Sequence, residues 1–417
     1  MKHILGLKCL ICGREYGPDE IEYVCPRHGA EGVVDVIYDY AFIKRTFTRE
    51  ALAASPERSM WRYKPLLPIS PEAKVPPLAV GWTPLYHAVS LGQALGLPQL
   101  WLKDDSRNPT ASFKDRASAL AVVKGQAQGA AVIATASTGN AAAALAGLCA
   151  SVGQPNVIFV PQTAPPAKVA QLLAYGSTVL LVEGSYDDAF ELCLQAGAAF
   201  GWYNRNTGFN PYMSEGKKTA ALEICEQFQF NPPSKIFVSV GDGCIIGGLH
   251  KGFKDLYALG WIDHMPQLMG VQAAGSAYLY QAWKNGEDVL TKGPVQTNTV
   301  ADSLAAGLPR DRLKAMAAVS ETQGAFLEVS DEAILAAIPA LAQATGVFAE
   351  PAAAAAYAGL LAAIAQGLVS VADRIVLLIT GSGLKDVAGA VKGTAQAGLQ
   401  ARTIAPTLAA VKETLNI

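Results

Sequence analysis

The feature that most constrains the fold is an alternation of short apolar runs with helix-length segments, which begins after a proline-rich stretch at 65–77. The first block contains apolar runs at 132–134, 157–160 and 179–182, and helix-like segments at 141–151, 166–175 and 185–199. Continuous apolar runs of this length are typical of strands buried on both faces of a parallel sheet. We therefore expect three buried strands with covering helices in this block.

A second block repeats the pattern further along the chain. It contains apolar runs at 236–240, 267–272 and 375–379, and helix-like segments at 248–258, 331–345, 352–366 and 386–396. Strands that alternate with helices predict parallel sheets with helices on both faces, and such folds bind ligands in the crevice beyond the strand ends. The expected fold class is α/β, with two doubly wound parallel-sheet domains and a small N-terminal zinc-ribbon-like knuckle.

The knuckle is predicted from two pairs of metal-ligating residues, Cys9 with Cys12 and Cys25 with His28. A two-residue gap lets a tight turn aim both side chains at one point, and two such turns supply a tetrahedral site. Gly13 suits the positive φ that such a turn often needs. We expect a structural zinc held by all four side chains. The alternative is a surface hairpin with small apolar cysteines and a free histidine. The other four cysteines lie singly in apolar sequence, which is typical of reduced, packed thiols.

The composition excludes several classes of protein. Only 16% of residues are charged and 51% are hydrophobic, so the chain buries enough apolar surface to exclude disorder. The net charge of -2 gives no basic footprint for nucleic acid. The longest run without strongly polar residues, 351–365, is shorter than the ~18 residues of a membrane span. The residues before the first cysteine are too few for a signal peptide. We expect a cytoplasmic protein that acts on small molecules.

The most informative stretch is Asn-Pro-Thr-Ala-Ser-Phe-Lys-Asp-Arg at 108–116, which predicts a turn that leads into a helix with Lys114 near its start. Most lysines are solvated surface charges. This one follows an aromatic residue at a helix N-terminus, where desolvation and the positive end of the helix dipole lower the pKa of an amine. A lysine of lowered pKa is suited to Schiff-base chemistry.

Two loops between a predicted strand and a predicted helix suit anions. The loop at 239–248, Ser-Val-Gly-Asp-Gly-Cys-Ile-Ile-Gly-Gly, can hold a phosphate through its backbone amides. It lacks the Lys-Ser/Thr ending of a P-loop and does not match the dinucleotide fingerprint. Glycine-rich turns also occur for steric reasons alone. The loop at 136–140, Ala-Ser-Thr-Gly-Asn, offers hydroxyls and amides that suit a carboxylate.

Five motifs that occur in order resemble those of a known family. They are Ser-Phe-Lys-Asp-Arg at 112–116, Ser-Thr-Gly-Asn at 137–140, Glu-Gly-Lys-Lys-Thr at 215–219, Glu-Pro-Ala-Ala-Ala at 350–354 and Thr-Gly-Ser-Gly-Leu-Lys-Asp at 380–386. Together they resemble threonine synthase and its relatives among the tryptophan-synthase-β-like, fold type II pyridoxal-phosphate enzymes. The resemblance covers nearly the whole chain, including the N-terminal knuckle. The set is highly specific for the superfamily and less specific for one substrate.

The resemblance implies a cofactor, pyridoxal 5'-phosphate, in the cleft, and a role for each matching residue. Lys114 would form the Schiff base and later move the Cα proton, Phe113 would pack beside the cofactor ring, and Asn140 would bind its 3'-oxygen. The cofactor phosphate would be held by the amides of Gly241, Asp242, Gly243, Cys244 and Ile245, the pyridine nitrogen would face Thr380, and the substrate carboxylate would be bound by Ser137, Thr138 and Gly139. Taken singly, several of these residues are equally typical of helix caps and turns.

The departures from the family pattern concern the substrate. Alanine stands at 111 and 117, where familiar members have glycine, and at 141, where a hydroxyl residue is common. Met213 stands where they have an arginine that binds the substrate phosphate. Replacement cations lie nearby, namely Arg205, Lys217 and Lys218 on the same segment, with Arg310 as a weaker candidate. Arginine suits phosphate because its fork donates two parallel hydrogen bonds, but each of these residues is equally compatible with an ordinary surface charge.

The leading hypothesis is a pyridoxal-phosphate-dependent lyase of the threonine synthase type, which converts O-phosphohomoserine and water to L-threonine and phosphate by γ-elimination and β-addition. The expected domains are the knuckle (1–40), a large cofactor-binding domain (41–104 and 216–417) and a small mobile domain (105–215). A homodimer is expected by analogy. One alternative is a β-eliminating or β-replacing enzyme, such as a threonine or serine dehydratase or an ammonia-lyase-like relative, which Met213 and Ala141 favour. A second is a non-catalytic binding protein, which an intact Lys114 disfavours.

Overall fold

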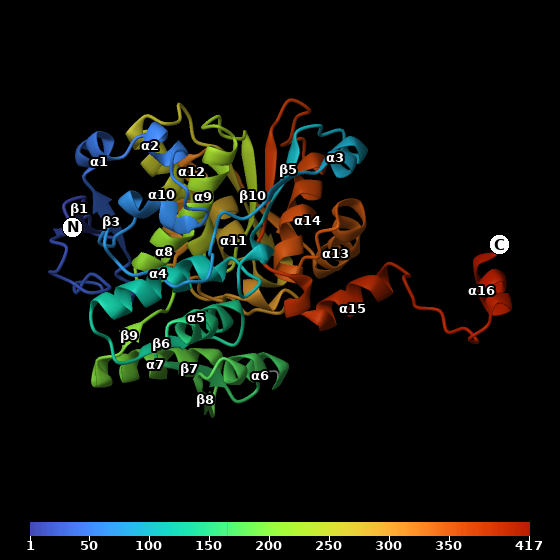
Figure 1. Cartoon of the computed structure of the whole chain (residues 1–417), viewed down its shortest axis with the longest axis horizontal. Helices are drawn as coiled ribbons and strands as arrows, with labels where there is room; N and C mark the ends of the chain where they lie inside the picture. The colour runs from blue at the N-terminus through green and yellow to red at the C-terminus, as the bar shows by residue number, and fades with distance from the viewer. Residues whose placement is uncertain (165) are drawn as a thin grey trace.

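Three β-sheets organise the computed structural model, which describes residues 1–164 and 166–417 (Figure 1). The largest sheet runs in the order β12 (Ala325–Val329), β11 (Gln267–Ala273), β10 (Lys235–Ser239), β13 (Ile375–Ile379), β5 (Leu100–Asp104) and β4 (Leu85–His87). All neighbours in it are parallel except β4 and β5. The three strands predicted in the second block of the sequence are confirmed, and they lie side by side in this sheet.

Helices cover both faces of the large sheet. Successive side chains of a strand point to opposite faces, so an entirely apolar strand makes both faces of the sheet apolar. Ile236 and Val238 of β10 pack in one core cluster with α10 (Cys244–Leu259) and α12 (Arg312–Glu321). Phe237, between them, packs in the other cluster with α13 (Asp331–Thr345) and α14 (Pro351–Ala365). The doubly wound arrangement predicted for this block is therefore confirmed.

A smaller, wholly parallel sheet runs in the order β8 (Thr178–Val182), β7 (Asn156–Pro161), β6 (Ile133–Ala136) and β9 (Tyr203–Asn204). Its helices are α5 (Asn140–Ser151), α6 (Pro166–Ala174) and α7 (Tyr186–Phe200). One prediction for this block is wrong. The run at 179–182 is a strand but is not buried, because β8 is an edge strand on which Leu180 and Leu181 are 41% and 57% exposed.

The N-terminal module (residues 1–40) is a three-stranded antiparallel sheet in the order β2 (Glu15–Tyr16), β1 (Ile4–Cys9) and β3 (Val34–Tyr38). It is bound to the large-sheet side of the molecule by buried polar contacts. Asp35 lies 2.8 Å from the ammonium of Lys314 on α12, and the Tyr38 hydroxyl donates to Glu215 at 2.5 Å.

The remaining helices connect these layers. They are α1 (Tyr40–Thr46), α2 (Arg49–Ala53), α3 (Val89–Leu95), α4 (Lys114–Ala127), α8 (Tyr212–Lys217), α9 (Thr219–Gln227), α11 (Tyr278–Asn285), α15 (Val387–Gln396) and α16 (Leu408–Leu415). Figure 1 shows α4 and α5 between the two larger sheets, and α16 standing apart at the C-terminus. Among the described residues, none of the helices combines the length and the hydropathy needed to cross a bilayer. The large sheet contains strands from both 85–104 and 235–379. The boundaries expected for the domains stay predictions.

A buried ion network fixes the start of α4. The Arg116 guanidinium donates to Asp105 at 2.6 Å and to Glu223 at 2.8 Å, and Lys103 donates to Glu223 at 2.7 Å. Burial alone would raise the pKa of Glu223, but Arg116 and Lys103 lower it to about 2. Removing one partner of such a buried pair typically costs about 3–5 kcal/mol because a charge is left uncompensated. The network therefore holds α4, β5 and α9 in one arrangement.

Candidate active site

Lys114 is the first residue of α4, and the turn before it is tied to the end of β13. The backbone N–H of Phe113 donates to the carbonyl of Thr380 at 2.8 Å. On the other side, the backbone N–H and hydroxyl of Thr110 donate to Asp115 at 3.1 Å and 2.8 Å. These contacts place the lysine beyond the carboxyl end of a central parallel strand, where ligands of such sheets bind.

The environment of Lys114 favours a neutral amine. Burial, followed by the nearby positive charges of Lys217 and Arg205, lowers the pKa of Lys114 to about 8. The lowered pKa expected from the sequence is therefore found, and desolvation is its largest cause. Near neutral pH such an amine is present in part as the nucleophile.

The loop after β10 leaves a run of backbone donors free. Gly243 has a φ of 89°, which favours glycine, and α10 begins at the next residue. The N–H groups of residues 241–246 donate no hydrogen bond to any part of the chain that the structure describes. Six consecutive free amides at a helix N-terminus form a cradle for an anion such as phosphate.

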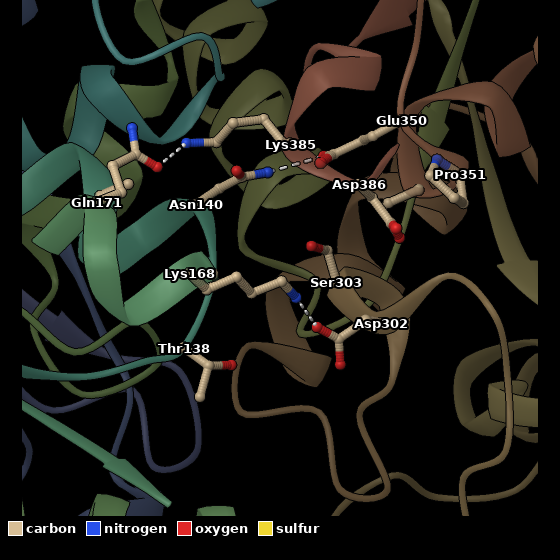
Figure 2. A pocket seen from close by; sticks show the side chains of 13 residues that line it. Thr138, Asn140, Lys168, Gln171, Asp302, Ser303, Glu350, Pro351, Lys385 and Asp386 are labelled. Atoms are coloured by element: carbon tan, nitrogen blue, oxygen red, sulfur yellow. Dashed lines mark hydrogen bonds and ion pairs between the residues drawn. The ribbon is translucent and has the colours of Figure 1, made fainter. Parts of the chain in front are cut away.

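The loop after β6 makes a second place for an anion at the start of α5. The N–H groups of Thr138 and of residues 140–142 have no hydrogen-bond acceptor among the described residues. The Asn140 side-chain amide donates to Glu350 at 2.8 Å, and Figure 2 shows the two side chains pointing toward each other. Burial raises the pKa of Glu350. Glu350 was missed as a site residue although it begins the motif at 350–354.

Arg205 is a buried cation that pairs with no carboxylate in the part of the chain that the structure describes. Its side chain is 1% exposed, and its guanidinium donates to Ser118 at 3.0 Å and to Thr207 at 3.3 Å. The Nη2 atom is buried and has no partner within residues 1–164 and 166–417. Burial lowers the pKa of Arg205 to about 10. A buried guanidinium nitrogen without an acceptor indicates a place for an anionic ligand, because leaving it unpaired is costly.

One cleft of about 1280 Å³ brings these groups together. The predicted site residues that line it are Lys114, Ser137, Thr138, Gly139, Asn140, Arg205, Gly241, Asp242, Gly243, Cys244, Ile245 and Thr380. Contacts cross the cleft at one end, where Lys168 of α6 pairs with Asp302 at 2.6 Å and Lys385 donates to Gln171 at 3.0 Å (Figure 2). Of these four residues, Lys385 belongs to the motif at 380–386, and the other three carry no signal in the sequence that distinguishes them from surface residues.

Three residues do not lie where the sequence led us to expect. Phe113 is fully buried in the main core, with Arg116 against its ring, and does not line the cleft. Lys218 is also outside the cleft, because its ammonium pairs with Glu215 and Asp255, each at 2.6 Å. Met213 is a core residue that also lies outside the lining, so its apolar side chain says little about the substrate.

The N-terminal module gathers its four candidate metal ligands. The thiols of Cys9, Cys12 and Cys25 and a ring nitrogen of His28 all lie within 4.8 Å of one another. The Nε2 atom of His28 is buried and has no hydrogen-bond partner in the described part of the chain. The hydroxyl of Tyr16 lies 2.9 Å from the Cys25 thiol. Three thiols and an imidazole in this arrangement fit a tetrahedral zinc ion.

Comparison with known proteins decides the family. Residues 77–381 match the model of the pyridoxal-phosphate dependent enzyme family. The chain belongs to this family. It is 36% identical over 390 residues to the threonine synthase of Methanocaldococcus jannaschii, covering 93% of this chain and 94% of that protein. It is 38% identical to the threonine synthase of Methanosarcina acetivorans, covering 91% and 92%. The resemblance drawn from the five motifs is confirmed.

Solved structures of the same fold extend the comparison. The processed form of threonine deaminase isoform 2 from Solanum lycopersicum superposes with a TM-score of 0.65 at 24% identity, covering 76% of this chain and 84% of that one. Diaminopropionate ammonia lyase from Escherichia coli gives a TM-score of 0.64 at 19% identity, covering 81% and 93%. At these identities the likeness concerns the fold alone, and it confirms the predicted α/β class.

The turn before Lys114 generates a stability prediction. Ala111 has a φ of 63°, a left-handed conformation that a side chain disfavours by about 1–2 kcal/mol. The Ala111→Gly variant should be more stable by roughly 0.5–1 kcal/mol, since the added freedom of glycine in the unfolded chain offsets part of the gain. The urea midpoint of the cofactor-free protein measures this. Ala198→Gly, at an exposed position of α7, should shift the midpoint the other way. A midpoint lowered in both variants would contradict the strain at 111.

Proposed function

We propose that this chain is a threonine synthase, which converts O-phosphohomoserine and water to L-threonine and phosphate. The observation that carries the proposal is a single cleft in which the Lys114 amine lies among three places for anions: the free amides of 241–246, the start of α5, and Arg205. A phosphorylated amino acid together with a phosphorylated cofactor requires three such places. The relatives named threonine synthase, at 36% and 38% identity over most of the chain, support the same reaction.

The residues of the cleft fit pyridoxal 5'-phosphate, the cofactor of the family. When bound, the cofactor supplies an electron sink for negative charge at the substrate's Cα and Cβ. In this chain Lys114 would hold it through its amine, and the amides of 241–246 would hold its phosphate. The Thr380 hydroxyl would face its ring nitrogen, and the Asn140 amide its ring oxygen. A neutral hydroxyl at Thr380 would leave that nitrogen unprotonated.

The substrate would be oriented by groups that the cofactor leaves free. Its carboxylate would accept hydrogen bonds from the amides at the start of α5, and its phosphate would accept them from Arg205. An amine with a pKa of about 8, as at Lys114, can both accept and return a proton near neutral pH, so it is suited to move the Cα proton. Because the Nη2 atom of Arg205 has no partner among the described residues, it is available to the leaving phosphate.

The β-eliminating alternative loses one of its two arguments. Met213 favoured it as an apolar replacement for a phosphate-binding arginine, but this residue is buried in the core and the cleft has Arg205 instead. Ala141 remains as the argument for that alternative, since it lines the cleft without a hydroxyl. To test this alternative, ammonia release from serine or threonine should be measured together with the reaction of O-phosphohomoserine.

The assay uses purified protein loaded with pyridoxal phosphate. O-phosphohomoserine should give equal amounts of phosphate and threonine. Arg205→Gln should lower kcat/KM by roughly 10–100-fold, the loss of a charged hydrogen bond. Arg310→Gln is the matched control, because Arg310 lines the same cleft but pairs with Asp187 at 3.7 Å, and it should change kcat/KM by less than about 3-fold. Ammonia release from serine with no reaction of O-phosphohomoserine would refute the proposal.

We also propose that the N-terminal module holds one structural zinc ion through Cys9, Cys12, Cys25 and His28. With all four positions taken by the protein, the metal would stabilise the module and would not take part in the reaction. Metal analysis of the purified protein should find one zinc per chain, and Cys12→Ser should reduce that content and lower the thermal midpoint. Cys149→Ser, which replaces a buried thiol of α5 far along the chain, should leave the zinc content unchanged. Equal zinc in both variants would contradict this ligand set.

Two further expectations, a homodimer and a cytoplasmic location, rest on the family resemblance and the composition. Both stay predictions. The exposed apolar residues of α16, with Leu408 at 81% and Leu415 at 58% exposure, are compatible with a contact to another chain but do not identify it.

A further inference from the structure

The N-terminal module contacts both sides of the cleft. Toward the large sheet, Asp35 pairs with Lys314 of α12. The residue that precedes α12, Asp311, donates its backbone N–H to the carbonyl of Asp242 in the phosphate cradle at 2.9 Å. Toward the small sheet, Tyr23, which lies two residues before Cys25, contacts β9. The metal-ligand cluster is thus linked to both walls of the site.

Tyr23 holds the strand that precedes Arg205. Its hydroxyl accepts a hydrogen bond from the backbone N–H of Asn204 at 3.0 Å. Its ring packs against Tyr203, with ring centroids 5.8 Å apart, and against Phe209, at 5.1 Å. β9 is the last strand of its sheet, so this hydroxyl provides a partner on the edge that faces away from β6.

The opposite edge of the same segment is tied to β6. The backbone N–H of Arg205 donates to the carbonyl of Ala134 at 2.8 Å, and the side chain of Asn206 accepts from the N–H of Ala136 at 2.8 Å. The segment is therefore held by β6 within the sheet, by Asn210, whose side-chain amide donates to the carbonyl of Asn204 at 2.7 Å, and by Tyr23 from the module. Of these three attachments, the one through Tyr23 depends on the order of the N-terminal module.

We propose that Tyr23 is a positioning residue that couples the cysteine–histidine cluster to Arg205, so that the metal-loaded module sets the affinity of the cleft for the anionic group of the substrate. A module of this size has little core of its own, so a bound metal supplies much of its order. With the module ordered, the Tyr23 hydroxyl fixes the backbone that carries Arg205. The inference rests on the proposed role of Arg205 in binding the substrate phosphate.

The test measures the affinity of the cofactor-loaded enzyme for inorganic phosphate by calorimetry in a phosphate-free buffer. Tyr23→Phe keeps the ring and removes the hydroxyl, so phosphate affinity should fall by about 2–10-fold, the effect of one neutral hydrogen bond. The cofactor's visible spectrum should stay unchanged, and the thermal midpoint should fall no further than in the control variant, because each variant loses one tyrosine hydrogen bond. Tyr40→Phe is the matched control, because its hydroxyl donates to Asp255 at 2.6 Å, away from Arg205. It should bind phosphate as the wild type does.

Two comparisons separate this inference from the proposed function. If Arg205→Gln binds phosphate as tightly as the wild type, the anion site at Arg205 is wrong. If Arg205→Gln weakens phosphate binding and Tyr23→Phe does not, the coupling through Tyr23 is wrong. A Tyr23→Phe variant with an altered cofactor spectrum, or with a thermal midpoint well below that of Tyr40→Phe, would also overturn the proposal, since the role of Tyr23 would then be a general structural one.

Removal of the metal tests whether the metal and Tyr23 act through the same contact. Treating the wild type with a chelator should weaken phosphate binding by at least the factor seen in Tyr23→Phe. The same treatment of Tyr23→Phe should weaken phosphate binding less, because this variant already lacks the hydrogen bond to Asn204 through which the metal is proposed to act. Equal losses in the two proteins would show that the metal and Tyr23 act independently, which would contradict the proposal.

Discussion

The position of Lys114 depends on the buried guanidinium of Arg116, two residues further along α4. Arg116 donates to Asp105 after β5 and to Glu223 on α9, and all three side chains are fully buried. A planar guanidinium that donates to two carboxylates fixes both the distance between the bonded groups and their relative orientation. The first turn of α4 is thereby held against the large sheet. The first residue of this helix, Lys114, is therefore placed beyond the end of β13.

The cleft around that amine combines unpaired backbone donors with uncompensated positive charge. The amides of 241–246 and those at the start of α5 have no internal acceptors among the described residues, and neither does one nitrogen of Arg205. Burial raises the pKa of Asp242 and of Glu350, so both carboxylates resist carrying charge there. Burial and neighbouring cations lower the pKa of Lys114. A site of this kind is incomplete without anions, which agrees with a phosphorylated cofactor and a phosphorylated substrate.

The strands, their parallel arrangement and the loops at the site could be predicted because each depends on local sequence. Buried strands are continuous apolar runs, and the two anion loops are glycine-containing turns between strand and helix. What failed depends on contacts between distant residues. The run at 179–182 is as apolar as a central strand, so it was predicted to be buried. Its position at the edge of the sheet depends on the order of the strands, which the run itself does not encode. Lys218 was taken for a ligand although Glu215, three residues before it, is a local partner. Its second partner, Asp255, lies 37 residues away and has no local signal. Glu350 begins the motif at 350–354, but its contact with Asn140, the first residue of α5, has no local signal.

The central claim is that Lys114 is the amine of lowered pKa that receives the cofactor in this cleft. The most direct measurement is the uptake of pyridoxal phosphate by the cofactor-free protein, followed by its visible absorption band as a function of pH. A lowered pKa means that the neutral amine prevails above about 8, so uptake should rise with pH with its midpoint near that value. Lys114→Ala should give no band at any pH. A midpoint near 10.5, the ordinary value for lysine, or a band that survives in Lys114→Ala, would contradict the account.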